Sequence, residues 1–538
     1  MASRTQVHSS WHPGPISALS SLLLAAALAA CGGGGGGSPA AAPAPAPPVQ
    51  APPPVPTLPG SYADPVVYSG APTASLASAQ EGAAKVQARI TLDGKPLDYT
   101  ATTGHLTATD LQTGQPAASF FYVAYTAGTQ PAAQRPVTFF YNGGPGSASI
   151  WLHLGSFGPR RLATSFPSTE PSATPPALVD NQETLLDHSD LVFVDAVGTG
   201  YSQAIAPRTN AQFWGVDQDA AAFRDFVRRY LAANNRQASP LYLYGESYGA
   251  PRTAVLANLL ESAGVRVAGV MLQSAAMNYY SNCGMFNPGQ ASCEGYIPSY
   301  AAVSSYHLSG SLPTDFSSVL QRAREFAAGS YRSEVNAFIG SGAAPSEATL
   351  AQLVSYAGLT TLTWRQDFSM TPGAYRARLV PGQVIGRYDA RVKAPVGSAL
   401  AQGGDPSMTL VGGAFVDTIR PYLESELRYT AVTPYLSSNN VLNQWNFSHD
   451  GKTLPDTIPD LAAAMTLNPS LKVIAMSGYH DLATPFYQTE LDLARLGAGS
   501  AIQIRNYDSG HMSYLDDRVR RLQKTDLRAF YNSVSVAQ

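Results

Sequence analysis

The feature that most constrains this chain is an alternation of short apolar strands with helical stretches, which a long interruption divides into two blocks. The first block predicts strands over 191–194, 241–244 and 267–272, with helices over 217–231 and 251–262. The second block predicts strands over 472–476 and 501–507, with helices over 489–496 and 516–530. Strands joined by helices assemble into a mostly parallel sheet that is covered on both faces. The chain is therefore expected to have an α/β core.

The stretch before this alternation has a different periodicity. Polar and apolar residues alternate over 85–92 and 117–125, and an apolar segment follows at 137–141. Turn signals such as Asp93-Gly94 separate these segments. We therefore expect antiparallel hairpins that lead into the main sheet.

Between residues 275 and 470 the alternation is lost. Glycine, serine, proline and tyrosine surround isolated helical stretches such as 314–328 and 348–356. We interpret this segment as a lid-like insertion. It divides the α/β core into a first part, 61–274, and a second part, 471–538.

The composition excludes several classes of function. The chain has 34 Lys and Arg residues against 37 Asp and Glu residues, so its formal net charge is −3. Without a basic excess, binding to nucleic-acid phosphates is not expected. Hydrophobic residues make up 45% of the chain and charged residues 13%, which predicts a well-filled core rather than disorder. The sequence has neither an H-E-x-x-H motif nor a Walker lysine motif, so no metal, nucleotide or redox cofactor is expected.

The N-terminus is typical of an exported lipoprotein. Residues 1–30 carry one charged residue, Arg4, and an apolar stretch that is too short for an ordinary membrane-spanning helix and ends in small residues before Cys31. A signal of this kind is cleaved before an acylated cysteine, so Cys31 is expected to be lipidated and to anchor the protein to a membrane. The alternative is an ordinary secretory signal with a chance cysteine. Either way, we expect an exported protein on the periplasmic or cell-surface side.

Residues 31–60 have the composition of a linker. Glycines occupy 32–37, and a proline- and alanine-rich tract extends to about residue 60. Such a segment cannot form a core, and its proline-rich part favours an extended polyproline conformation. We interpret it as a stalk that holds the folded part away from a membrane, with an inert low-complexity spacer as the alternative.

The two remaining cysteines, Cys283 and Cys293, lie close together in a stretch rich in Gly, Asn and Pro. In an oxidising, exported compartment this spacing favours a small disulfide loop. No other cysteine and no paired histidine lies near them in the sequence, so a zinc site is not expected.

The sharpest local motif is GESYG at 245–249, which has the pattern G-x-S-x-G with Ser247 at its centre. The motif directly follows a predicted strand and precedes a predicted helix. A nucleophile elbow requires this context, because the strand-to-helix turn is crowded and needs small residues two positions before and two positions after the serine. The sequence therefore predicts that Ser247 is a catalytic nucleophile.

A serine nucleophile requires a base and an acid that follow it in the chain. Asp481 comes after the predicted strand 472–476, and His511 comes after the predicted strand 501–507. These positions fit the order Ser, acid, His. His480 is a rival base and Asp508 a rival acid, but His480 lies beside the acid, and Asp508 lies too close to His511 in the chain to reach it easily.

An acyl-transfer serine also needs donors for the oxyanion. The backbone N–H of Tyr248 supplies one, and the glycine-rich loop 141–146 after an apolar strand is the expected source of the second, with a purely structural turn as the alternative. Asp195 is expected to be a structural carboxylate for the loop 197–200, and His153 and His188 have no partner pattern and are expected to be structural.

Together these segments resemble the serine carboxypeptidase family. The matching stretches, in the family's order, are YNGGPGSAS at 141–149, FVDAVGTGYS at 193–202, GESYGAPR at 245–252, SGYHDLATP at 477–485 and SGHMSY at 509–514. The resemblance implies an α/β-hydrolase fold with an insertion over the active site. It also implies a catalytic triad of Ser247, Asp481 and His511.

The resemblance further implies an oxyanion hole made of the N–H groups of Gly144 and Tyr248, and a site for the substrate's terminal carboxylate at Asn142 and Glu246. A carboxylate that faces Glu246 is disfavoured unless one of the two acids is protonated. Members of the family accordingly tend to act as peptidases at acidic pH.

Three positions depart from the family's pattern. Ser147 stands where the family usually has a cysteine, so the disulfide made there is absent. Ser156 stands near the position of a second acid that the family often uses to bind the carboxylate. The loop after His511 has Ser-Tyr in place of the common Val-Pro, which is expected to change that loop more than the base.

The leading hypothesis is hydrolysis of the C-terminal peptide bond of a peptide with a free C-terminus, through an acyl-enzyme on Ser247. An esterase or acyltransferase that uses the same triad is the alternative, because a triad does not identify its leaving group. A noncatalytic, surface-anchored binding protein is the alternative from a different class.

Overall fold

The structure is a computed structural model that describes residues 60–111, 113–170, 177–284, 291–308, 314–497 and 502–533. The predicted signal, the lipidation site Cys31 and the linker up to residue 59 lie outside the described residues. Within the described part of the chain, no helix is both long enough and apolar enough to cross a membrane.

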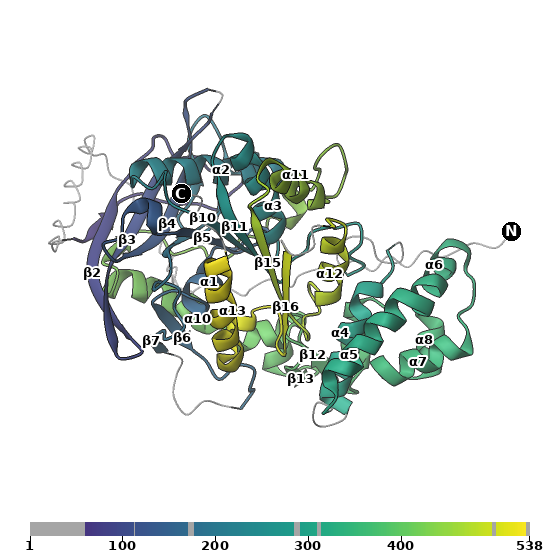
Figure 1. Ribbon diagram of the computed structural model, residues 1–538. Coiled ribbons are helices and arrows are strands. Elements are labelled where there is room, and N and C mark those ends of the chain that lie inside the picture. The colour runs from purple at the N-terminus through teal and green to yellow at the C-terminus, as the bar shows by residue number, and fades with distance from the viewer. Residues whose placement is uncertain are drawn as a thin grey trace, which may run out of the picture. The chain divides into compact units, whose positions relative to one another are not determined.

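A 10-stranded sheet forms the centre of the structure (Figure 1). Along the sheet the strands follow the order β16, β15, β11, β10, β5, β8, β4, β3 and β2, and β9 pairs with β4 at one side. The bounds are β2 Ala83–Leu92, β3 Lys95–Thr109, β4 Pro116–Ala127, β5 Val137–Tyr141, β8 Asp190–Val194, β9 Gln203–Ala204, β10 Leu241–Glu246, β11 Val267–Gln273, β15 Lys472–Gly478 and β16 Ile502–Tyr507.

The sheet has an antiparallel part and a parallel part. Strands β2, β3 and β4 pair antiparallel with one another, and β4 also pairs antiparallel with β8. From β8 to β16 the pairs are parallel. The predicted hairpins and the predicted parallel core are therefore both confirmed. The sequence pattern alone does not predict β3, the longest of these strands.

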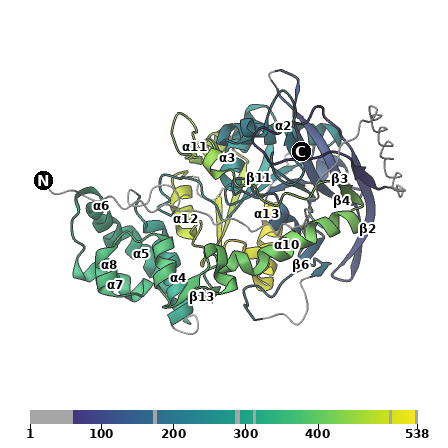
Figure 2. The ribbon, with the colours of Figure 1, turned by 180° about the vertical axis from the view of Figure 1, so that it is seen from behind.

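The central parallel strands β5, β8 and β10 are buried along their whole length because helices cover both faces, whereas the edge strand β16 is largely not buried. Every residue of β5 is buried, as expected where neither face meets water. On one face the core includes residues of α2 (Val216–Ala233), α3 (Gly249–Ser262) and α11 (Ile458–Leu467). On the other face it includes residues of α1 (Ile150–Gly155), α10 (Pro406–Ser425) and α13 (Asp517–Ser533). Figure 2 shows both helical layers from behind.

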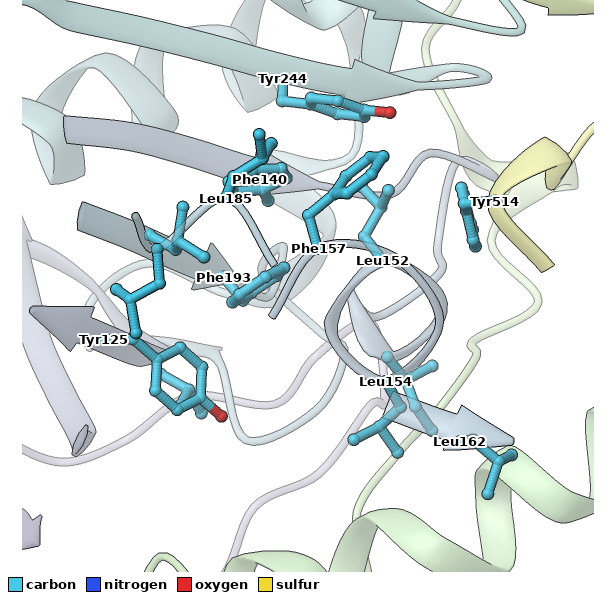
Figure 3. Close-up of a cluster of buried hydrophobic side chains, with 14 of the residues drawn as sticks. Tyr125, Phe140, Leu152, Leu154, Phe157, Leu162, Leu185, Phe193, Tyr244 and Tyr514 are labelled. Atoms are coloured by element: carbon cyan, nitrogen blue, oxygen red, sulfur yellow. The ribbon is translucent and has the colours of Figure 1, made fainter. Parts of the chain in front are cut away.

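Aromatic side chains fill the second of these cores (Figure 3). The rings of Phe193 and Tyr244 both stack on the ring of Phe140, with centroids 4.8 Å apart in each pair. These three residues lie on the adjacent strands β8, β5 and β10. Their stacking holds together the strands whose ends carry the predicted site.

Residues 275–470 pack in two ways. The helices α4 to α9 form a group with an apolar core of their own, which also contains Cys283 and Cys293. These two cysteines are joined by a disulfide, as predicted. In contrast, α10 and α11 belong to the two cores of the main sheet. The bounds are α4 Ile297–Leu308, α5 Phe316–Phe326, α6 Arg332–Ser341, α7 Glu347–Ala357, α8 Thr361–Gln366, α9 Pro372–Arg378 and α12 Phe486–Ala494.

Three short two-stranded sheets complete the described structure. One of them pairs β1 with β14, which joins residues near the start of the described chain to the segment after α10. The bounds are β1 Tyr62–Asp64, β14 Tyr429–Ala431, β6 Arg160–Ala163, β7 Ala177–Asp180, β12 Gln383–Ile385 and β13 Lys393–Pro395.

The chain order of the central strands defines the fold. β5 and β8 exchange places relative to their order in the sequence, and helices α2 and α3 flank the strand β10 along the chain. A mostly parallel sheet with this crossover, preceded by antiparallel strands, is the α/β-hydrolase fold. The predicted fold class is therefore confirmed.

Candidate active site

Ser247 occupies the sharp turn between β10 and α3. Its backbone φ is 60°, a left-handed conformation that is unusual for a residue with a side chain. A Cβ atom on Gly245 would collide with the carbonyl oxygen of Gly249, and one on Gly249 would lie 2.8 Å from the carbonyl oxygen of Tyr141. Both glycines are therefore required by the close approach of the chain, as in a nucleophile elbow.

Asp481 and His511 come together from the ends of two neighbouring strands, β15 and β16. Nδ1 of His511 lies 2.7 Å from Oδ2 of Asp481, and both side chains are buried. Oδ1 of Asp481 accepts hydrogen bonds from the N–H groups of Ala483 and Thr484 at 2.7 and 3.0 Å. The Thr484 hydroxyl donates to Oδ2 at 2.7 Å. The carboxylate is thus fixed in one orientation against the imidazole.

The environment of His511 favours its protonated form. Burial lowers its pKa, but the charge of Asp481 and the hydrogen bond to it have a larger combined effect, so the pKa is raised overall. The backbone of His511 is held on both sides, since its N–H donates to the carbonyl of Tyr388 at 2.6 Å and its carbonyl accepts from the Ser274 hydroxyl at 2.7 Å. These bonds position the ring.

Ser247 and His511 line the same pocket, which has a volume of about 250 Å³. Its other walls are the glycine-rich loop after β5, the acid Glu246, and side chains from distant segments. The lining residues are Asn142, Gly143, Gly144, Pro145, Gly146, Ser147, Trp151, Glu246, Ser247, Tyr388, Met408, Ser438, Asn439, His511 and Met512. The structure therefore brings the predicted nucleophile and the predicted base to one cavity.

The glycine-rich loop lies directly against the elbow. A Cβ atom on Gly143 would collide with the amide nitrogen of Tyr248, so only glycine permits this approach. The next residue, Gly144, has φ of 107°, which a residue with a side chain rarely adopts. The loop, whose glycines line the pocket, therefore lies directly against the amide of Tyr248, the residue after Ser247.

Glu246 is an acid that is buried in this pocket, with 2% of its surface exposed. Burial is the main reason that its pKa is raised to about 7, although His511 and hydrogen bonds from Tyr514 and Asn142 act in the opposite direction. Asn142 is fixed as well, because its Oδ1 accepts the N–H of Leu152 at 3.0 Å.

Several residues of the site could not be predicted from local sequence motifs. Tyr388 reaches the pocket from the segment between α9 and α10, and Met408 from the first turn of α10, where no local motif marks them. The ring of Tyr388 lies 4.9 Å from that of His511. Tyr514 is marked in the sequence by the departure from the common Val-Pro after His511. Its contact with Glu246 could not be predicted, because the two residues are brought together only by the fold.

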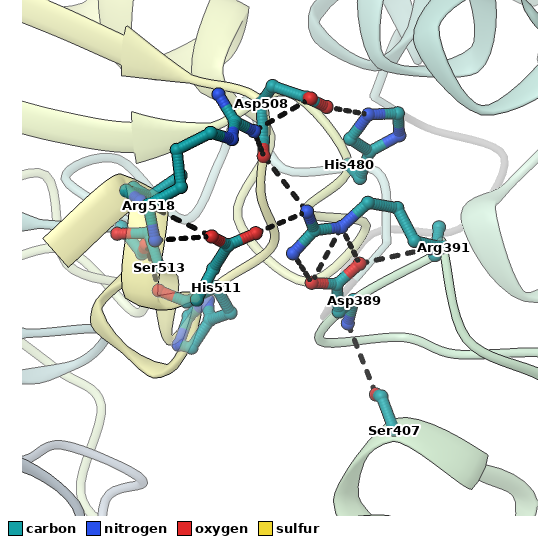
Figure 4. Close-up of polar contacts among 12 residues, drawn as sticks. Asp389, Arg391, Ser407, His480, Asp508, His511, Ser513 and Arg518 are labelled. Atoms are coloured by element: carbon teal, nitrogen blue, oxygen red, sulfur yellow. Dashed lines mark hydrogen bonds and ion pairs between the residues drawn. The ribbon is translucent and has the colours of Figure 1, made fainter. Parts of the chain in front are cut away.

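The rival residues His480 and Asp508 pair with each other instead. Nε2 of His480 lies 3.0 Å from Oδ1 of Asp508. Asp508 also accepts a hydrogen bond from Arg518 at 2.9 Å, and its carbonyl accepts one from Arg391 at 2.9 Å. Figure 4 shows this network beside His511. Neither rival residue is among those that line the pocket.

The other polar residues considered in the sequence have structural partners. Asp195 accepts hydrogen bonds from the N–H of Ser149 and the hydroxyl of Tyr435, both at 2.8 Å, and burial raises its pKa to about 6. Nε2 of His153 lies 2.7 Å from the Tyr125 hydroxyl, and burial lowers the pKa of His153 to about 3. Asp195 therefore ties the start of α1 to the end of β8.

His188 and Ser156 also have local partners. The His188 ring stacks on that of Tyr531, and its Nε2 lies 3.4 Å from Asp187. Ser156 is fully buried, and its hydroxyl donates to the carbonyl of Leu152 at 2.5 Å. Ser156 therefore contributes no acid to the pocket. Among the described residues, no group of three or more His, Cys, Asp or Glu side chains is placed to hold a metal ion.

Comparison with solved structures finds enzymes of varied activity. A prohormone-processing carboxypeptidase, Kex1(Δ)p from Saccharomyces cerevisiae, is 15% identical, with 80% of this chain and 91% of that chain covered and a TM-score of 0.49. A proline iminopeptidase from Mycobacterium smegmatis is 13% identical, with 84% and 100% covered and a TM-score of 0.32. A putative aryl esterase from Burkholderia cenocepacia is 14% identical, with 79% and 98% covered and a TM-score of 0.30.

Residues 93–274 match the model of a known family, the serine carboxypeptidases. This range contains the glycine-rich loop, the end of β8 and the elbow with Ser247, and it ends before Asp481 and His511. The resemblance predicted from the sequence motifs is thereby confirmed. Over residues 93–274 the chain is therefore similar to the serine carboxypeptidase family.

Proposed function

We propose that this protein hydrolyses the C-terminal peptide bond of peptides through an acyl-enzyme on Ser247. One observation carries the proposal: Ser247 and His511 line one pocket, while Nδ1 of His511 is hydrogen-bonded to Asp481. This bond occupies one ring nitrogen and leaves Nε2 to take the proton of the serine hydroxyl. The three residues thus have the roles of nucleophile, base and orienting acid.

The reaction proceeds in two steps. Ser247 attacks the carbonyl carbon of the last peptide bond, and His511 takes the serine proton and passes it to the leaving amine, which departs as the C-terminal amino acid. Water then attacks the ester on Ser247, with His511 again as the base. Asp481 holds the imidazolium that forms in each step, consistent with the raised pKa of His511.

The oxyanion of each step is stabilised by the N–H groups of Tyr248 and Gly144. Two observations support this assignment. Gly143 lies so close to Tyr248 that the loop backbone and the elbow amide face one region, and Gly144 is among the residues that line the pocket beside Ser247. Amides held in place by the fold stabilise a developing charge without reorganisation.

The preference for a free C-terminus comes from Asn142 and Glu246. Both are buried at the pocket, and the carboxyl of Glu246 holds a proton up to higher pH than an ordinary glutamate because burial raises its pKa to about 7. A protonated Glu246 donates a hydrogen bond to the substrate carboxylate, whereas an ionised Glu246 repels it. The peptidase activity is therefore expected to be lost as the pH rises above about 7.

The proposal is tested by the release of the C-terminal amino acid from an N-blocked dipeptide between pH 4 and 8. The C-amidated dipeptide, the matching alkyl ester and the variant Ser247→Ala are assayed in parallel. We expect the free-acid peptide to be cleaved, with loss of the activity upon amidation and in the variant. Equal cleavage of the acid and the amide would remove the role of Asn142 and Glu246, and turnover by Ser247→Ala would overturn the mechanism.

An esterase or acyltransferase is the second candidate, and Ser156 is the observation that favours it. The site has no second acid at this position, and the Ser156 hydroxyl is committed to Leu152. Ester turnover without cleavage of any peptide, still dependent on Ser247, is the result that would establish this function in place of the first.

We also propose an exported location with a lipid anchor at Cys31. The disulfide between Cys283 and Cys293 supports an oxidising compartment. In the native host, the variant Cys31→Ser is expected to move from the membrane fraction to the soluble fraction. An unchanged distribution would argue against the anchor.

A further inference from the structure

Tyr514 is a buried residue that faces the candidate active site and has no role in the mechanism above. It lies in the short turn Ser513–Leu515, between His511 and α13, and is fully buried. Its hydroxyl donates a hydrogen bond to Oε2 of Glu246 at 2.8 Å. It also hydrogen-bonds the side chain of Asn142. One phenol therefore contacts both residues of the proposed carboxylate site.

The tyrosine ring has little freedom to move. It is part of the aromatic core on the side of the sheet that faces α13, where Figure 3 shows it near Leu152. A Cβ atom on Gly155 would lie only 2.9 Å from the ring. Because the ring is held by packing on all sides, its hydroxyl is presented to Glu246 by the fold.

We propose that Tyr514 is a positioning residue of the substrate-carboxylate site, which donates to Oε2 of Glu246 so that Oε1 carries the proton shared with the peptide's C-terminal carboxylate. This inference rests on the proposed function. The phenol keeps its own proton, and one proton taken from solvent by Glu246 is sufficient to bind an ionised substrate. Tyr514 thereby supplies a neutral donor in a site that lacks a second acid near Ser156.

The surroundings of Glu246 are consistent with this arrangement. The ionisable groups that face it are His511 and Asp481 from the two C-terminal strand ends, Tyr244 on its own strand, Tyr388 from the segment before α10, and Tyr514. Burial raises the pKa of Tyr514 well above its ordinary value, and the charge of Glu246 raises it further. Tyr514 therefore remains a neutral donor over the whole pH range of the reaction.

The test compares full-length wild type with Tyr514→Phe, which removes only the hydroxyl. The control is Tyr300→Phe, another fully buried tyrosine, which lies in the group of helices α4 to α9 and donates its hydroxyl hydrogen bond to the carbonyl of Met370 at 2.9 Å. For each protein, kcat and KM are measured between pH 4 and 9 on the N-blocked dipeptide, its C-terminal amide and its alkyl ester. The ester and the amide lack the carboxylate, so they report on the triad alone.

For Tyr514→Phe we expect KM for the free-acid peptide to rise about 2- to 10-fold, the usual effect of losing a hydrogen bond between neutral groups, while kcat on the ester stays near wild type. The alkaline limb of the peptidase profile is expected to move to higher pH, because loss of the donor raises the pKa of Glu246. Tyr300→Phe is expected to leave both quantities unchanged. A purely structural role would not shift the limb.

Two results would overturn the inference. If Tyr514→Phe keeps both the wild-type KM for the free acid and the wild-type alkaline limb, the positioning role is excluded while the proposed function stands. If wild type itself does not distinguish the acid from the amide, the carboxylate site and the role of Tyr514 fall together.

A second variant covers the case in which Tyr514→Phe does not fold. Incorporation of 3-fluorotyrosine at position 514 keeps the shape and strengthens the donor, so the alkaline limb is expected to move to lower pH. An unmoved limb in this variant would also overturn the inference.

Discussion

Two histidine–aspartate pairs lie on the same two loops of this protein, and only one of them opens onto the pocket. His511 pairs with Asp481 at 2.7 Å, and His480 pairs with Asp508 at 3.0 Å. Both pairs join the loop after β15 to the loop after β16, with the order of acid and histidine reversed. The difference lies in their surroundings: His511 lines the cavity that contains Ser247, whereas His480 packs against the ring of Tyr306.

The charges around the two pairs are balanced in different ways. Burial raises the pKa of Asp508, but His480 and the cations of Arg391 and Arg518 outweigh it and hold that pKa below its usual value. In the pocket, burial of Glu246 is not compensated, and its pKa is raised to about 7. The network around Asp508 is therefore compensated: cations offset the burial of its acid. The pocket instead buries Glu246 without such compensation, which is typical of a functional site.

The largest difference between the pairs is expected from replacing the two histidines. His511→Gln should lower kcat/KM by about 10⁴-fold or more, because the serine loses its base. His480→Gln should change kcat/KM by less than about tenfold, since glutamine retains a donor for Asp508 and the residue does not border the pocket. Steady-state kinetics on the ester substrate measure both effects.

Circular dichroism and thermal unfolding serve as the control for these variants, because a misfolded protein would also be inactive. The assignment of the base would be reversed if folded His480→Gln were inactive while His511→Gln retained turnover.

The next largest difference is expected from the two acids. Asp481→Asn should lower kcat by about 10³- to 10⁴-fold, because an amide no longer fixes the imidazole in the reactive tautomer or stabilises its positive form. Asp508→Asn should leave kcat within about tenfold and act mainly on stability. Pre-steady-state measurement of acylation compares the two, and an equal loss of rate in both variants would contradict the distinction.

Much of the fold was predictable from local patterns. The strand expected at 137–141 has the same bounds in β5, and the helix expected at 217–231 lies within α2. Periodicity was sufficient because each element buries one apolar face or two. The strand β3 received no range, since its threonine-rich sequence has weak alternation and is stabilised by its two neighbours in the sheet.

The site was predictable to the extent that its residues lie at strand ends. Ser247, Asp481 and His511 each follow a predicted strand, and the carboxyl ends of parallel strands meet at one edge of the sheet. Tyr388 and Met408 could not be predicted in this way, because they reach the pocket from a segment without regular alternation. The rival pair His480 and Asp508 shows the same limit, since residue type and spacing do not reveal which pair borders a cavity.

The compensated network is expected to contribute more to stability than to the rate. The side chain of Arg391 is 5% exposed and bonds Asp389 at 2.7 Å and Asp516 at 2.9 Å. Arg391→Met leaves these acids without their cation and should lower the free energy of unfolding by about 3–5 kcal/mol. The matched control is Arg518→Met, whose side chain is 54% exposed, with an expected loss below about 1 kcal/mol. Urea unfolding measures both, and equal losses would contradict the comparison.

The smallest effect is expected from Glu246, and it has the opposite sign. The pKa of Glu246 is raised in the folded protein to about 7, so its contribution to stability is fully present below the ordinary glutamate pKa and is lost as the pH rises through 7. Glu246→Gln removes this loss and should raise the free energy of unfolding at pH 8 by about 3 kcal/mol, with little change at pH 4. The control Glu347→Gln, at a side chain that is 72% exposed, should stay within about 0.5 kcal/mol at both pH values.

Asp195 and Asp492, whose pKa values burial raises to about 6 and about 7, give wild type a pH dependence of the same sign, so only the difference between variant and wild type isolates Glu246. If that difference were equal at pH 4 and pH 8, Glu246 would not hold its proton in the folded protein, and the pocket would carry an ionised acid where the substrate carboxylate has to bind.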